Sequence, residues 1–118
     1  MPFEMIEEGC LLIATLSGVM RRADYDAFWK RSAQLIHKHG RMRALIVTSN
    51  FGGWERSENW ADFDLVTERD RYVEKIAVVA DQKWKDEVLM FMAKPFREVS
   101  IEFFPSEQLA EARKWVEG

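Results

Sequence analysis

The sequence predicts an α/β fold: a mixed, mostly parallel sheet of five strands with four helices. The first observation is an alternating segment and a tight reversal at the start of the chain, which indicate one antiparallel pair. The second is a short apolar stretch followed by a helix start, which repeats four times as β-α units do in parallel sheets. These stretches are Cys10–Ser17, Met42–Ser49, Lys75–Asp81 and Val99–Pro105.

The first two strands are predicted close to the N-terminus. Phe3–Glu7 alternates apolar and polar residues, as a half-exposed strand does. Glu8 and Gly9 then allow a tight reversal into a second strand at Leu11–Leu16. We therefore expect these two strands to pair in antiparallel orientation.

The first helix is predicted between two glycines. Gly18 ends the second strand, and Asp24 serves as the N-cap or as an acid in the first turn. Gly40 ends the helix in the manner of a C-terminal cap. Because its apolar residues share one face, we expect the helix to pack on the sheet. The apolar residues of this face are Tyr25, Phe28, Trp29, Leu35 and Ile36, and Ser32 lies on the same face.

The third strand, Ala44–Thr48, is nearly continuous in apolar and β-branched residues, which is typical of a strand buried on both faces. A loop over residues 49–55 follows it, and a second helix is predicted to start near Ser57 or Asn59. The apolar face of that helix is thin. It consists of Trp60, Phe63 and Val66.

The last two β-α units are predicted in the C-terminal half. The fourth strand, Ile76–Ala80, ends in Asp81, and the helix after it stops at Pro95. The fifth strand, Val99–Phe103, leads to Ser106, which can cap a final helix. The strand residues expected to be buried are Leu45, Ile46, Val47, Ile76, Val78, Val79 and Ile101. The helix residues expected to face the sheet are Trp84, Val88, Phe91 and Met92, then Leu109, Ala112 and Val116.

Length and composition exclude several classes of protein. The 118 residues predict a single domain over residues 1–118. The single cysteine, Cys10, forms no internal disulfide and is expected to be a buried structural thiol. The net charge of −3 and the lack of a concentrated basic face argue against nucleic acid as a partner. The apolar stretch at Cys10 is too short to span a bilayer, and no secretory signal is recognisable, so we expect a cytoplasmic protein without stable membrane insertion.

No pattern of residues predicts catalysis, a metal or a cofactor. His37 and His39 are two apart at a helix end, so they point in different directions. Asp62 and Asp64 have the same spacing, which gives paired-carboxylate chemistry no geometric basis. Gly52-Gly53 lacks the spacing of a nucleotide-binding loop and is interpreted as a flexible pair. We therefore expect no cofactor and no catalytic residues.

The candidate site lies at the carboxyl ends of the strands, where α/β sheets place their ligands. Phe51, Trp54 and Trp60 either line a ligand pocket or partner surface there, or close the core. Asp81 either provides a polar contact at the rim or caps the following helix. The predicted site residues are Ser49, Asn50, Phe51, Trp54, Trp60 and Asp81.

The order and spacing of several short segments resemble those of the small bacterial SpoIIAA-like, or STAS/SEC14-type, proteins, and the resemblance covers essentially the whole chain. The segments are the glycine turn before Asp24-Tyr25, the loop Phe51-Gly52-Gly53-Trp54, the strand Ile76–Asp81 with Trp84 beyond it, Phe103-Phe104, and Glu111–Trp115. The resemblance implies a superhelix of β-α units. This fold is shared at a distance with anti-sigma-factor antagonists and with lipid-binding CRAL-TRIO domains.

Anti-sigma-factor antagonists of this fold carry a phosphorylatable serine after the third strand. Here that stretch reads Thr48-Ser49-Asn50-Phe51, which lacks the preceding acid and places a bulky aromatic beside Ser49. We therefore interpret Ser49 as a hydrogen-bonding loop residue.

Taken together, the residues predict a noncatalytic binding module that recognises a protein partner or a small apolar ligand through its aromatic loop. The alternatives are a small enzyme of unknown chemistry using Asp81 or Ser49, and a phosphoswitch like that of anti-sigma-factor antagonists. A homodimer is also expected, because helices gathered mainly on one face leave apolar surface uncovered. Phe51, Phe63 and Met90 motivate this expectation.

Overall fold

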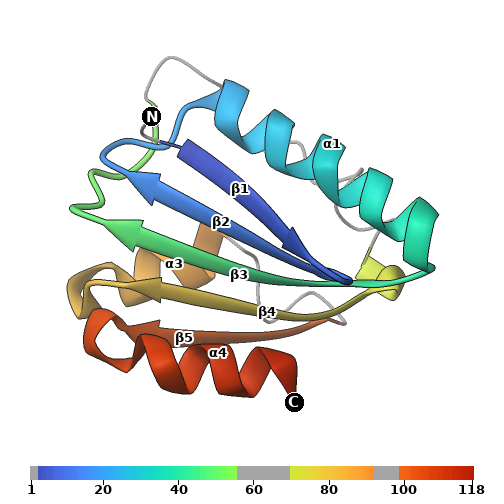
Figure 1. Cartoon of the computed structure of the whole chain (residues 1–118). Coiled ribbons are helices and arrows are strands. Elements are labelled where there is room, and N and C mark those ends of the chain that lie inside the picture. The colour runs from blue at the N-terminus through green and yellow to red at the C-terminus, as the bar shows by residue number, and fades with distance from the viewer. Residues whose placement is uncertain (1–2, 56–69, 92–98) are drawn as a thin grey trace.

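Five strands pair in chain order to form one sheet (Figure 1). The computed structural model describes residues 3–55, 70–91 and 99–118. β1 is antiparallel to β2, and each later strand is parallel to its predecessor. The predicted mixed, mostly parallel sheet is therefore confirmed. The strands are β1 (Phe3–Glu8), β2 (Leu11–Ser17), β3 (Met42–Ser49), β4 (Val73–Ala80) and β5 (Ser100–Pro105).

The β1–β2 hairpin follows from the two residues between its strands. Glu8 pairs with Leu11, so the turn consists of Gly9 and Cys10 alone. Gly9 has a φ of +60°, a conformation that glycine adopts at little cost. Cys10 is only half-buried, contrary to the expectation of a buried thiol, because it lies in this turn and not within the strand.

Three α-helices are present in the described part of the chain, against four predicted for the whole. They are α1 (Arg22–His39), α3 (Lys85–Phe91) and α4 (Leu109–Glu117). The helix predicted to start near Ser57 or Asn59 lies outside the described residues, as do Phe63 and Pro95. Trp84, expected within a helix, instead ends the short 3-10 turn η2 (Gln82–Trp84) that precedes α3.

The two ends of α1 are stabilised by the residues that the sequence singled out. Asp24 is a first-turn acid, and its carboxylate accepts a hydrogen bond from the backbone N–H of Arg21 at 3.2 Å, within a capping box. Gly40 has a φ of +81° and donates its N–H to the carbonyl of Ile36 at 2.7 Å. Both predictions about this helix are confirmed.

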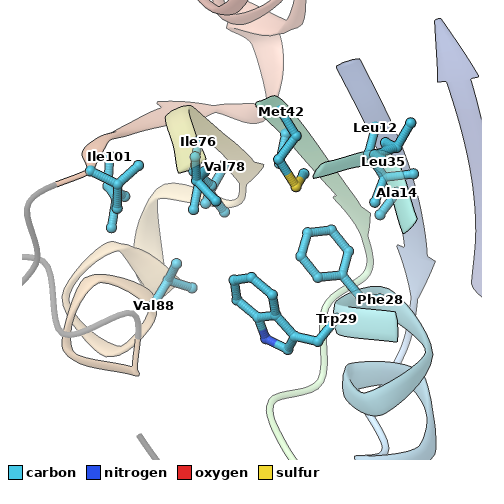
Figure 2. Packing of buried hydrophobic residues seen from close by; sticks show 13 residues of the cluster. Leu12, Ala14, Phe28, Trp29, Leu35, Met42, Ile76, Val78, Val88 and Ile101 are labelled. Atoms are coloured by element: carbon cyan, nitrogen blue, oxygen red, sulfur yellow. The ribbon is translucent and has the colours of Figure 1, made fainter. Parts of the chain in front are cut away.

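Each face of the sheet has its own core. Because side chains alternate along a strand, Val78 faces the side that α1 and α3 cover, while Val79 faces α4. Figure 1 shows α3 and α4 on opposite faces, and Figure 2 shows Phe28 and Trp29 of α1 converging with Val88 of α3. The first core cluster includes Leu12, Ala14, Phe28, Trp29, Ile76, Val78 and Val88, and the second includes Leu11, Leu45, Ala77, Val79, Ala112 and Val116.

The predicted strand core is confirmed except at two positions of β3. Ile46 and Val47 are half-buried and pack at the margins of the first and second core clusters, respectively. Val47 stays partly open because α4, nine residues long, is the only described helix on its face. The remaining predicted residues are buried: Leu45, Ile76, Val78, Val79 and Ile101.

Candidate functional site

The loop after β3 continues the sheet beside the loop after β2. The N–H of Gly52 donates to the carbonyl of Gly18 at 3.0 Å, and that of Met20 donates to the carbonyl of Gly53 at 2.9 Å. A Cβ on Gly52 would lie 3.1 Å from a methyl group of Val19, and Gly53 has a φ of +93°. The glycine pair is therefore held in place by these contacts, and its interpretation as a flexible pair is wrong.

Glu55 anchors the end of this loop to α1. Its carboxylate accepts a hydrogen bond at 3.1 Å from the backbone N–H of Arg22, the first residue of the helix. An acid at this position also complements the positive end of the helix dipole. The sequence predicted only a loop position for Glu55, because nothing local indicates a partner 33 residues away.

Three aromatic side chains gather where the loops after β3 and β4 meet. We call Phe51, Trp54 and Trp84 the aromatic cluster. Phe51 lies 5.2 Å from Trp54 and 4.9 Å from Trp84 between ring centroids, and the two tryptophans are 6.1 Å apart. All three contacts are edge-to-face, the favoured arrangement of aromatic pairs. The cluster is half-buried and packs against the first core cluster.

One polar atom in the aromatic cluster is unsatisfied. The indole Nε1 of Trp84 is fully buried and has no hydrogen-bond partner among the residues that the structure describes. Such buried donors are rare in folded proteins, and each requires an explanation. Helical spacing predicted Trp84 as a residue facing the sheet, but such spacing carries no information about where an indole N–H points.

The predicted polar residues occupy the same edge but face solvent. Ser49 and Asn50 are exposed, and Asn50 adopts a left-handed φ of +51°. Asp81 is also exposed, and its carboxylate accepts a hydrogen bond from the backbone N–H of Lys83 at 3.0 Å. The capping interpretation of Asp81 is therefore confirmed. Trp60 lies outside the described residues.

We expect Asp81→Asn to leave the free energy of unfolding nearly unchanged, because asparagine caps as well as aspartate does. Asp81→Ala removes the acceptor for Lys83 and should cost about 1 kcal/mol. Urea denaturation of both variants checks this. Equal losses in Asp81→Asn and Asp81→Ala would show that the charge of Asp81 matters more than its hydrogen bond.

A pocket at the opposite end of the strands escaped the sequence analysis. It has a volume of about 340 Å³ and is open to solvent. Charged partners surround it, since Arg41 and Arg43 bind the carboxylate of Glu74 at 3.0 and 2.8 Å, and Arg113 pairs with Glu8. Arg41 and Arg43 are therefore ion-paired with Glu74 of β4. The pocket is lined by Glu8, Cys10, Leu11, Arg41, Arg43, Val116 and Glu117.

Arg43 and Lys75 hold the C-terminal end of α4. Arg43 donates to the carbonyl of Val116 at 2.8 Å, and Lys75 donates to that of Trp115 at 3.0 Å. Cations at this position complement the negative end of the helix dipole and satisfy its terminal carbonyls. The contacts of Arg43 and Lys75 with the carbonyls of α4 therefore have a structural explanation, which is the docking of this helix on the sheet.

The hydrogen bond from Arg43, followed by that from Arg41, lowers the pKa of Glu74 below its ordinary value of 4.5. The stability that Glu74 contributes is thus fully present above pH 4.5 and is lost as the pH falls through the lowered pKa. We expect Glu74→Gln to lose less thermal stability than the wild type between pH 6 and pH 3. Melting curves at both values check this, with the exposed Glu107→Gln as control. An unchanged acid response in Glu74→Gln would contradict the assignment.

Two classes of site find no support in the described residues. Residues 3–55, 70–91 and 99–118 contain no group of three or more histidine, cysteine or acidic residues that could hold a metal ion. Among the helices described there, none is both long enough and apolar enough to cross a membrane.

Comparison with known proteins gives one family and one fold. The model of the SpoIIAA-like family matches residues 11–117. The chain is also similar to a crystal structure of an uncharacterised protein with a SpoIIAA-like fold from Shewanella loihica PV-4. The TM-score is 0.69 at 16% sequence identity, and the match covers 97% of this chain and 91% of the other. The two proteins therefore have similar folds. No curated protein matches the chain.

Proposed function

This chain belongs to the SpoIIAA-like family, and we propose that it is a noncatalytic binding module for a small apolar ligand. The ligand contacts the aromatic cluster at the carboxyl ends of the strands. In open α/β sheets this end is where ligands bind. The cytoplasm is the expected location.

The observation that carries the proposal is the half-burial of the aromatic cluster at the junction of two loops. Phe51 and Trp54 come from the loop after β3, and Trp84 comes from the turn after β4. A flat protein interface would expose such rings as a patch, whereas pockets for small apolar molecules are lined by partly buried aromatics. The arrangement therefore favours a small ligand over a protein partner.

The polar groups at this edge support a noncatalytic role. The carboxylate of Asp81 is engaged as a cap, and Ser49 is exposed in the loop. A catalytic serine needs a base within hydrogen-bond reach. An enzyme using Asp81 or Ser49, and a phosphoswitch at Ser49, remain the alternative proposals.

The proposal is tested by native mass spectrometry of protein purified from its own cells. We expect a bound small molecule in the wild type, and its loss in Phe51→Ala. The matched control is Phe104→Ala, since Phe104 is also half-buried but packs on the second core cluster. Circular dichroism establishes that both variants are folded. Retention of the adduct in Phe51→Ala would contradict the proposed site, and a co-purifying polypeptide in place of a small molecule would favour a protein partner.

The homodimer also stays a prediction. Of the residues that motivated it, Met90 is 78% exposed on α3, while Phe51 packs in the aromatic cluster and so does not contribute an open surface. Ile6 on β1 adds apolar surface, with 57% exposure. Light scattering at micromolar concentration should give twice the chain mass of 13.9 kDa. A monomer mass would contradict self-association.

A further inference from the structure

We propose that Trp84 donates its indole N–H to the ligand, and that the ligand is an uncharged apolar molecule with a carbonyl oxygen. This rests on the proposed function and names the class of ligand. Its starting point is the indole Nε1 of Trp84, which is buried and has no acceptor within residues 3–55, 70–91 and 99–118.

The missing partner must be an acceptor. An indole nitrogen donates one hydrogen bond and accepts none. A buried donor without an acceptor costs about 1 to 3 kcal/mol, and buried tryptophans therefore usually find a partner for this atom. A ligand that brings an oxygen to Nε1 of Trp84 recovers this cost on binding.

The surroundings of Trp84 favour a neutral acceptor. Its described neighbours are the rings of Phe51 and Trp54 and the backbone of Gly53, whose added Cβ would lie 3.3 Å from the indole. Lys83 and Lys85 flank Trp84 in the chain but are exposed. Burying a carboxylate against these rings would carry the large cost of removing a charge from water. A ketone, ester or amide oxygen meets the N–H without that cost.

The aromatic cluster also indicates the rest of the molecule. Its three rings contact one another edge-to-face and are each only half-buried. Covering the remaining apolar ring surface with apolar atoms removes it from water, which is favourable. The ligand is therefore expected to carry its carbonyl on a hydrocarbon skeleton.

The inference is tested on the full chain with ¹⁵N-labelled tryptophan. The probes are 2-undecanone, undecane, which lacks an acceptor, and decanoate, which is charged. We expect 2-undecanone to bind most tightly and to move the Trp84 indole proton resonance downfield. Trp84→Phe keeps an aromatic ring and removes the donor, so it should weaken binding of 2-undecanone about tenfold. Trp115→Phe, the same change against the second core cluster, should leave the affinity unchanged.

The outcomes separate this inference from the proposed function. If 2-undecanone perturbs Trp54 but binds Trp84→Phe equally well, the donor role is wrong and the binding site stands. If undecane or decanoate binds as tightly as the ketone, the ligand class is wrong. The Trp84 indole proton could also exchange with a bound water and respond to none of the probes. In that case the N–H donates to buried water, and the inference is wrong. The mass-spectrometric adduct then still decides the proposed function.

Discussion

Val78→Asp is expected to abolish folding of this chain. Val78 is 3% exposed in β4, which has a paired strand on either side, and its side chain faces the first core cluster. An aspartate there buries an unpaired carboxylate at a cost of several kcal/mol. Since a domain of this size is stable by only about 5 to 15 kcal/mol, little folded protein should remain.

The matched control is Val19→Asp, which makes the same change at a position that is 47% exposed. Both variants are compared by circular dichroism and thermal melting. Val19→Asp should melt cooperatively near the wild-type temperature. Soluble Val78→Asp protein with a cooperative transition would show that β4 is placed wrongly.

Trp54→Ala is expected to lower the free energy of unfolding by about 3 kcal/mol, toward the lower end for a deleted core aromatic. The reason is that Trp54 is half-buried and makes edge-to-face contacts with both Phe51 and Trp84. The same variant should lose the bound apolar molecule, because it removes one side of the aromatic cluster. Denaturant unfolding and native mass spectrometry measure the two effects separately.

Trp115→Ala provides the comparison for Trp54→Ala. Trp115 is also half-buried and contacts Phe104 at 6.0 Å between ring centroids, on the opposite face of the sheet. It should destabilise the protein to a similar extent while keeping the ligand. If Trp54→Ala melts far below the wild type but binds unchanged in the folded fraction, the aromatic cluster is core and not a binding site.

Most of the secondary structure in the described residues could be predicted because its causes are local. The alternation in β1, the two-residue turn at Gly9 and the glycine stop at Gly40 each depend on a few consecutive residues. The site could be predicted only as a location, because the carboxyl ends of neighbouring parallel strands meet at one edge. That rule correctly brought Phe51 close to the residues after Asp81.

Contacts between distant segments could not be predicted in the same way. The hydrogen bond from the Arg22 N–H to Glu55 links residues far apart in the chain. The same is true of the pocket that Cys10 and Val116 line together. Burial is similarly nonlocal, since Val47 and Val79 look alike in sequence, yet only Val79 is fully covered. Which side chains α4 covers depends on where that helix docks.

The sequence by itself determined the five strands, the antiparallel start, the ends of α1 and the edge of the sheet that holds the aromatic loop, because backbone propensity and hydrophobic periodicity act over a few residues. Only the tertiary structure decided the strand order, the placement of α4 opposite α3, and the burial of the Trp84 N–H with no acceptor in the described part of the chain. These depend on packing among segments whose separation in the chain carries no information about their distance in space.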